Sequence, residues 1–382
     1  MNRLACAAAL LCAIAAPKIH AQWTIQDSHT TADLRGIHAI GNGIAWASGT
    51  NGTVLRTTND GKDWQRCTTP PDAGHLDFRG IQAFDASTAI VMSSGKGPLS
   101  RLYKTTDACH NWKLVFTNPD PEGFWDALQF SDRSHGLLLG DPVGSSFYLA
   151  ETHDGGLHWL PQHPKGLSAE QSLQGAFAAS NSSLLLWNAS TQFGSGGLSG
   201  ANVYSESEII ICLDDCPESD LNLDGSKNRW TRLLLPVGHP TESSGIFSLA
   251  ARSTLPAVRG QGIVVAVGGD YLKPDDTTSI AATSSDAGQH WIASTTPPHG
   301  YRSAVAYDPT TRTWITVGPN GTDISTDDGR NWRPLRPSPA PDGKPTSPDG
   351  IPEDQHWNAL SLPFVVGPHG RIGKLNPQSL TR

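Results

Sequence analysis

A tryptophan-ended octapeptide recurs along this chain and constrains its fold more than any other feature. The pattern is Ser/Thr-x-Asp-x-Gly-x-x-Trp, and residues 152–159, 284–291 and 325–332 match it in full. Residues 57–64 carry Asn59 in place of the aspartate, residues 105–112 carry Cys109 in place of the glycine, and a degenerate copy ends at Trp230. Such self-similarity predicts a repeat architecture rather than a single irregular core.

Each position of this box has a physical reason. The hydroxyl and the carboxylate accept hydrogen bonds from backbone N–H groups in a turn. Glycine permits the positive φ at which a hairpin reverses, and the tryptophan ring packs between neighbouring strands. Three short strand patterns precede the box in residues 34–57 and again in residues 301–326. A fourth strand follows the tryptophan, so each unit reads as one four-stranded propeller blade.

The number of units predicts seven blades. Six boxes mark six fourth strands, whereas the last unit, residues 356–375, has three strands and no box. Trp23–Gln26 resembles the residues after each box, and Trp23 precedes Trp64 by 41 positions, as Trp291 precedes Trp332. We therefore expect an all-β, seven-bladed β-propeller of four-stranded antiparallel blades. The N-terminal strand Trp23–Gln26 would complete the last blade and close the ring, which leaves no open sheet edges.

The first residues predict export. Leu4–Ala16 is an apolar run too short to span a bilayer, and a small residue, Ala21, offers a cleavage site. We expect residues 1–21 to be a cleavable signal peptide, residues 22–382 to form one propeller domain, and the mature chain to be a secreted or periplasmic monomer. Without Arg3 and Lys18 it has 26 basic and 36 acidic residues, a net charge of −10. That charge disfavours binding to nucleic acids or anionic membranes.

Four cysteines remain after cleavage, and an even number in an oxidising compartment favours disulfides. We expect Cys67 to pair with Cys109 and Cys212 with Cys216. Free buried thiols are the alternative.

The boxes, the Arg-Gly-Ile strand openings and the ring closure resemble the photosystem II stability/assembly factor family. These are seven-bladed propellers of plants and cyanobacteria, with relatives in non-photosynthetic bacteria, and the resemblance covers residues 22–382. It implies an assembly factor without catalytic activity and an arginine-rich patch on the propeller. Sialidases and sortilin-type receptors also carry the box, and the insertions in blades four and five depart from the compact family repeat.

A binding site is expected where the inner strands of the blades begin, because these strands line the central channel. We align seven residues at this mouth: Arg35, Arg79, Trp125, Gln174, Phe247, Arg302 and Trp357. Three arginines and two tryptophans would form a cationic, aromatic funnel for a protein partner or an acidic ligand. Asp141 and Asp270 follow second strands and would join the same face. The alternative is that each arginine pairs with a carboxylate of a neighbouring blade.

One local motif suggests calcium. Asp220, Asn222 and Asp224 fit the start of a calcium loop, although its twelfth position is Thr231 rather than a bidentate glutamate. A solvated acidic turn is the alternative, and no other cofactor is expected.

The sequence favours a non-catalytic protein-binding or assembly module, with a sialidase-like glycoside hydrolase as the alternative. The boxes and the three arginines support the hydrolase. Against it, Arg35 is followed by Gly36 and Ile37 rather than by Ile-Pro, and only eight glutamates remain in the mature chain. Glycoside hydrolysis needs paired carboxylates, or a Tyr/Glu pair, at a defined separation. Tyr271 and Tyr301 have no obvious glutamate partner.

Overall fold

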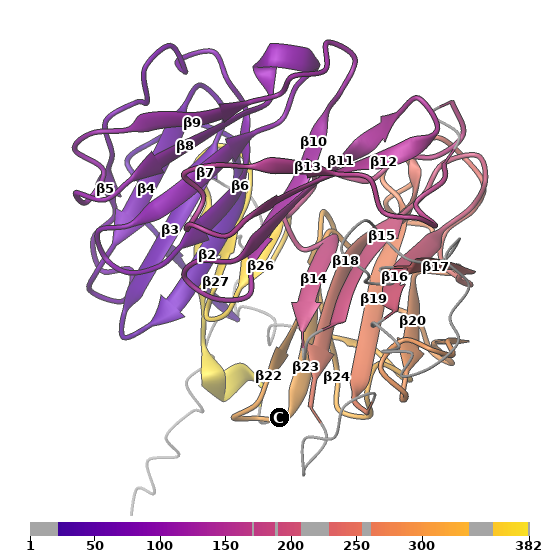
Figure 1. The fold of residues 1–382 in the computed structure, drawn as a ribbon. Helices are drawn as coiled ribbons and strands as arrows, with labels where there is room; N and C mark the ends of the chain where they lie inside the picture. Colours follow the sequence, from indigo (N-terminus) through magenta and orange to yellow (C-terminus); the bar gives the residue numbers. More distant parts are fainter. Residues whose placement is uncertain are drawn as a thin grey trace, which may run out of the picture.

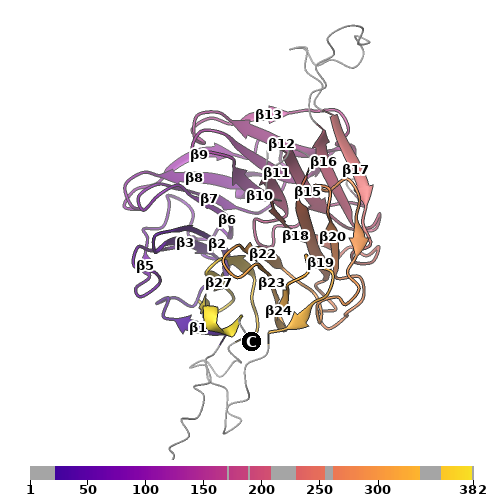
Figure 2. The same cartoon turned by 90° about the horizontal axis from the view of Figure 1, so that it is seen from below.

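The computed structural model describes residues 22–169, 172–187, 190–207, 229–253, 261–335 and 354–380. Its strands form seven four-stranded antiparallel sheets, which stand as blades around a common axis (Figures 1 and 2). The expectation of an all-β, seven-bladed propeller is therefore confirmed. Within the described ranges, two short 3-10 helices occur: Gly97–Leu99 lies between strands, and Pro377–Ser379 follows the last strand. None of the helices in the described ranges is long and apolar enough to cross a membrane. The predicted signal peptide lies outside these ranges.

The first three blades follow one another along the chain, each from its inner to its outer strand. Blade one consists of β2 (Leu34–Gly41), β3 (Ile44–Gly49), β4 (Thr53–Thr57) and β5 (Gln65–Arg66). Blade two consists of β6 (Phe78–Ala83), β7 (Ala89–Ser93), β8 (Arg101–Thr105) and β9 (Lys113–Thr117). Blade three consists of β10 (Trp125–Phe130), β11 (Gly136–Val143), β12 (Ser146–Thr152) and β13 (Leu160–Gln162).

The remaining blades repeat this order until the last. Blade four consists of β14 (Leu184–Trp187), β15 (Ser190–Ser195), β16 (Asn202–Ser207) and β17 (Arg229–Leu234). Blade five consists of β18 (Ser244–Arg252), β19 (Ile263–Asp270), β20 (Ala281–Ser284) and β21 (Ile292–Ala293). Blade six consists of β22 (Ala304–Asp308), β23 (Thr313–Gly318), β24 (Gly321–Ser325) and β25 (Arg333–Pro334). Blade seven joins β26 (Ala359–Ser361), β27 (Phe364–Val366) and β28 (Ile372–Leu375) to β1 (Trp23–Gln26).

The two ends of the chain meet in blade seven. β1 runs antiparallel to β28, with Trp23 opposite Leu375. The Trp23 ring is fully buried beside Trp357, and its Nε1 donates a 3.0 Å hydrogen bond to Thr322 in blade six. The inner strand of every blade contacts that of the next, and β26 contacts β2, so the blades form a closed ring. In Figure 2 the inner strands β2, β6, β10, β18 and β22 surround the centre, and β1, β5, β9, β13 and β17 lie at the periphery.

The box segments are turns that satisfy their own backbone groups. In residues 152–159, the Thr152 hydroxyl donates to the Asp154 carboxylate at 3.0 Å and accepts from the Gly156 amide at 2.8 Å. The same carboxylate accepts the amides of Leu157 and His158, each at 3.0 Å. These bonds hold the pKa of Asp154 below its ordinary range, against the opposing effect of burial. In the other four full or near-full boxes, a backbone amide likewise donates to the hydroxyl oxygen of Thr57, Thr105, Ser284 or Ser325.

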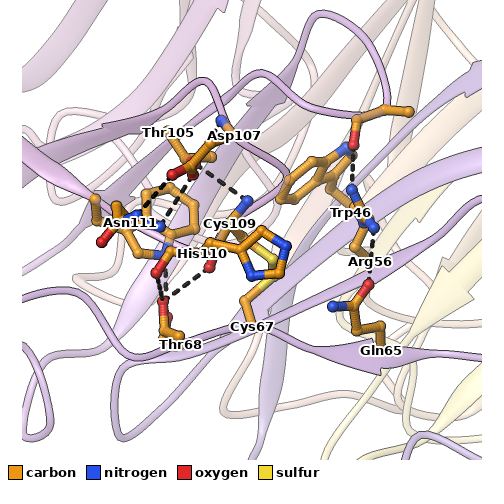
Figure 3. Close-up of a disulfide and its surroundings, with 12 residues drawn as sticks. Trp46, Arg56, Gln65, Cys67, Thr68, Thr105, Asp107, Cys109, His110 and Asn111 are labelled. Carbon is orange, nitrogen blue, oxygen red and sulfur yellow. Dashed lines mark hydrogen bonds between the residues drawn. A yellow bond between two sulfur atoms is a disulfide. The ribbon is translucent and has the colours of Figure 1, made fainter.

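A disulfide joins Cys67 to Cys109, the pairing expected from the sequence (Figure 3). Cys109 occupies the glycine position of the second box at φ 62°, a left-handed conformation that glycine adopts more readily. Cys67 follows the outer strand of blade one, so the bond ties two neighbouring blades together across 42 residues of sequence. Hydrogen bonds from the Thr68 hydroxyl to the carbonyls of Cys109 and His110 reinforce the junction. Cys212 and Cys216 lie outside the described residues.

Candidate functional site

The inner strands of four blades share a backbone irregularity at their mouth end. We call this face, where inner strands begin, the mouth face, and the opposite face, which carries the boxes, the box face. A β-bulge leaves one residue near the start of each of these strands out of the ladder, and such bulges redirect a side chain. The bulged residues are Arg35, Arg79, Asp126 and Phe247.

The residue before each bulge points instead into the blade interior. Leu34, Phe78, Trp125 and Ile246 have no exposed surface. Backbone hydrogen bonds extend this register to blades six and seven. The amides of Leu34, Arg302 and Trp357 each donate to the carbonyl of a glycine at or near the end of the preceding blade's second strand. Those glycines are Gly367, Gly268 and Gly318, respectively. Arg302 and Trp357 are therefore equivalent to Leu34, and Ser303 and Asn358 take the mouth position.

This register corrects the alignment made from the sequence. Trp125, Arg302 and Trp357 stand one residue before the mouth position, and they are 0%, 0% and 1% exposed. In blade three the residue at the mouth is Asp126, which the sequence alignment missed. A small residue directly after the mouth position could have identified the correct alignment from the sequence. It recurs at the start of the inner strand in six blades, as Gly36, Gly80, Ala127, Ser248, Ala304 and Ala359.

Arg302 is the centre of a buried ion-pair network. Its guanidinium binds the Asp323 carboxylate, and both side chains are fully buried. It also donates to the Asn320 side chain at 2.6 Å and to the Tyr301 carbonyl at 2.9 Å. The same carboxylate binds His299 Nδ1 at 2.8 Å and raises the pKa of that histidine. Arg302 thus holds blade six together and presents no charge at the mouth.

The two tryptophans and Gln174 are also interior residues. Trp125 stacks on Phe116 and Tyr148, with ring centroids 5.2 and 6.4 Å away. Trp357 lies beneath the Arg371 guanidinium, 4.8 Å from its ring centroid. Gln174 is 6% exposed. Neither tryptophan forms part of an open surface.

Arg35 and Arg79 are the two aligned arginines that reach the mouth, and their environments differ. Arg79 pairs with Asp77 at 2.8 Å, within its own blade, and donates to the Ala178 carbonyl at 3.3 Å. The alternative of a structural ion pair therefore fits Arg79, although its partner is not in a neighbouring blade. Arg35 is half-buried, and its Nε is a buried donor without a hydrogen-bond partner among the described residues. An unmatched buried donor of this kind is costly unless a ligand completes it.

The centre of the propeller is crossed by residues 176–182, which we call the channel segment. In blade four, Gly175 pairs with Gly196 and the Ser183 carbonyl accepts from Gly194, so the seven residues between leave the sheet. Hydrogen bonds tie the segment to the inner-strand regions of four other blades: through Ala178 to Arg79, Asn181 to Leu128, Ser182 to Leu249, and Ser180 to Ser303. The channel segment therefore closes the central channel, and we call its mouth-facing side the floor. A ligand bound at the mouth would contact this floor.

Aromatic rings gather beside this floor. Phe177 of the channel segment stacks on Phe247 with centroids 4.0 Å apart, and Phe247 meets the edges of Tyr301 and Tyr271 at 4.8 and 6.1 Å. Tyr271 is 47% exposed. Burial raises the pKa of the Tyr301 hydroxyl, and the positive charge of Arg35 partly opposes the rise. The mouth therefore combines an unmatched guanidinium with an aromatic wall.

Two aspartates form a carboxyl pair on the same face. Asp126 is 1% exposed, and burial together with the nearby Asp141 carboxylate raises its pKa, against the effect of Arg79. Burial also raises the pKa of Asp141 to about 6, and its Oδ1 accepts the Ala176 amide at 2.9 Å. Asp141 lines a cavity of about 280 Å³ together with Gln174, Phe177 and Glu242. Two like charges in a buried pair do not ionise together easily, so Asp126 binds a proton more readily than an ordinary aspartate.

Replacing Asp141 by asparagine should stabilise the protein at pH 8 but not at pH 4. The folded-state pKa, about 6, lies above the ordinary value of 3.8, so this carboxyl loses stabilising free energy as pH rises from 4 through 6. Asparagine does not ionise, and its amide oxygen can still accept from Ala176. We expect a gain of about 1–2 kcal/mol in the free energy of unfolding at pH 8. Urea unfolding at both pH values measures it, and a gain of equal size at pH 4 would contradict the assigned pKa.

Asp270 has a local structural role. It is 4% exposed, accepts from the Leu272 amide at 3.0 Å, and contacts the Thr241 hydroxyl at 3.4 Å. It thus shapes the loop that presents Tyr271, and no hydrogen bond joins it to an arginine in the described chain. Asp220, Asn222 and Asp224 lie outside the described residues. In the part of the chain that the structure describes, no group of three or more His, Cys, Asp or Glu side chains could hold a metal ion.

Comparisons place this architecture among known propellers. No protein-family model matches the chain, and no curated protein matches it. A solved structure described as YCF48 bound to D1 peptide has a TM-score of 0.56 and 14% identity, covering 93% of this chain and 97% of its own. A GH74 xyloglucanase from Xanthomonas campestris has a TM-score of 0.56 and 14% identity, covering 94% of this chain and 54% of its own. An ancestral GH74 enzyme has a TM-score of 0.54 and 11% identity, covering 94% of this chain and 47% of its own. At these identities the likeness shows the shared fold alone.

Proposed function

We propose that this chain is an exported, non-catalytic propeller that binds a protein partner on its mouth face and acts as an assembly-type factor. The observation that carries the proposal is Arg35, whose buried Nε has no hydrogen-bond partner among the described residues, on the same face as the exposed Tyr271. A carboxylate of the partner would bind the Arg35 guanidinium, and apolar side chains would pack on Tyr271, which is 47% exposed. Arginine suits such contacts because its planar group binds carboxylates in a bidentate manner and stacks on rings.

The solved propeller bound to D1 peptide supports this proposal, because it shares the fold and its ligand is a peptide. The bridged channel supports it as well. A mouth with a floor offers a concave surface, whereas an open tube would let a small ligand pass through. The proposal includes the expected export signal in residues 1–21 and a monomeric mature protein.

Charge reversal at Arg35 should abolish partner binding. We expect Arg35→Glu to lower the recovery of cross-linked partners from the native compartment by tenfold or more, since a charged contact at the site becomes repulsive. Lys62→Glu and Arg330→Glu are matched controls, because both residues are exposed in box turns on the opposite face. Unchanged recovery with Arg35→Glu, or equal losses in the controls, would refute the mouth as the binding face.

A glycoside hydrolase is the second candidate, and the Asp126/Asp141 pair favours it. Asp141 and Glu242 line one cavity, and the buried Asp126 carboxyl interacts with Asp141, so this face offers the carboxyl groups that acid–base hydrolysis needs. Hydrolysis of a xyloglucan or a fluorogenic sialoside, lost in Asp141→Asn but retained in Glu122→Gln, would favour this candidate. No turnover in the wild-type protein would exclude these two substrates.

A further inference from the structure

A second cavity opens on the box face, between blades three and four. Its volume is about 480 Å³, within the range of small-molecule sites. Blade three contributes the ends of β10 and β12 and the start of β11, and blade four contributes β14, β15, β16 and β17. Because inner strands end on this face, the cavity lies at the opposite end of the blades from Arg35 and Tyr271. The proposed mouth function therefore does not use it.

The walls of this cavity are aromatic and aliphatic. Trp230 of β17 is 4% exposed, and Trp187 at the end of β14 is partly buried. Phe130, Leu137 and Leu149 complete the apolar lining from blade three. Tryptophan rings of this kind attract organic cations through the negative face of the indole.

The polar lining carries two carboxylates. Glu151 of β12 and Glu206 of β16 both line the cavity, and no lysine or arginine is among the lining residues that the structure describes. Burial raises the pKa of Glu206, the nearby Glu151 charge adds to the rise, and Thr191 opposes it with a hydrogen bond. Glu151 is also 3.5 Å from His153, whose ring meets His135 edge to face at 5.3 Å. Two carboxylates that repel each other in a half-buried cavity leave a site that a cation would stabilise.

We propose that this cavity binds a small organic cation, such as an alkyl amine or a guanidinium compound. The ligand's charge would lie between Glu151 and Glu206, and its alkyl chain would pack against Trp187 and Trp230. An anion is excluded by the two carboxylates. A neutral sugar could stack on the tryptophans, but it would leave the two negative charges uncompensated.

The test uses the full mature protein and defined probes. Spermidine and agmatine are titrated at pH 7.5 while tryptophan fluorescence and the heat of binding are recorded, with 1,8-octanediol as a neutral probe and adipate as an anionic one. We expect saturable binding of both cations and none of the other two. Glu206→Gln and Glu151→Gln should each weaken cation binding by about tenfold or more, because each removes a charge-assisted contact. Glu122→Gln is the matched control, since its exposed carboxylate pairs with Lys96 elsewhere on the surface.

Three results would overturn the proposal. The first is an absence of saturable cation binding up to about 10 mM, a concentration that corresponds to about 2.7 kcal/mol of binding free energy. The second is unchanged affinity in both glutamine variants, each verified as folded by circular dichroism. The third is binding of octanediol, or of a neutral xyloglucan oligosaccharide, as tight as that of spermidine. None of these results bears on the mouth face, so the two proposals fail separately.

Discussion

Replacing Trp23 by alanine should lower the free energy of unfolding by about 3–5 kcal/mol, the usual cost of removing a large buried aromatic side chain. Trp23 is fully buried, packs against Trp357, and bonds to Thr322 of the adjacent blade. The variant should therefore weaken blade seven, in which the two ends of the chain pair. Reversible urea unfolding, followed by circular dichroism at 25 °C, measures the change.

Thr24→Ala is the matched control for this experiment, because Thr24 lies in the same strand and is exposed. Its effect should stay within about 0.5 kcal/mol, as for other surface substitutions. If Trp23→Ala costs no more than Thr24→Ala, then β1 does not hold the ring closed in solution.

The paired substitution Cys67→Ser and Cys109→Ser should cost about 4 kcal/mol, which is the chain-entropy cost for a closed loop of this length. The disulfide closes a loop across 42 residues and ties the end of blade one to the second box. The loss should appear as a lower urea midpoint with little change in the native circular dichroism spectrum. The measurement compares oxidised wild type, wild type in dithiothreitol, and the serine variant.

Reduced wild type and the serine variant should unfold at similar urea concentrations, and both should unfold well below the oxidised protein. A serine variant as stable as oxidised wild type would contradict the structural role of the bond. Cys109 is also the residue at the glycine position of its box, so a Cys109→Gly variant with Cys67→Ser should recover part of the loss by relieving the strain of a positive φ.

The sequence was sufficient to predict the fold because the repeat carries its own register. The box hydroxyl, carboxylate and tryptophan recur at fixed spacing, and each has a local role that does not depend on distant contacts, as Thr152, Asp154 and Trp159 illustrate. The spacing of Trp23 likewise pointed to its strand partner, since β1 lies where a post-box strand would lie.

The mouth was harder to predict, because its residues depend on bulges and on one departure from the repeat. A bulge shifts the side-chain direction by one residue. The sequence therefore suggests Trp125 as the mouth residue of blade three, although Asp126 occupies that position. In the sequence Arg302 aligns with Arg35, but in the structure its side chain lies in the interior and pairs with Asp323. The channel segment has no counterpart among the described residues of the other blades, and its contacts with four of those blades are all long-range.

The most direct test of the central claim, that the partner docks on the mouth face beside Arg35, is site-specific photo-crosslinking. A benzophenone amino acid replaces Tyr271 at the mouth or Leu160 at the outer edge of blade three, where the side chains are 47% and 59% exposed. The account predicts a discrete protein adduct from position 271 that disappears with Arg35→Glu and is absent from position 160. An adduct from position 160 alone, or one from position 271 that persists with Arg35→Glu, would contradict it.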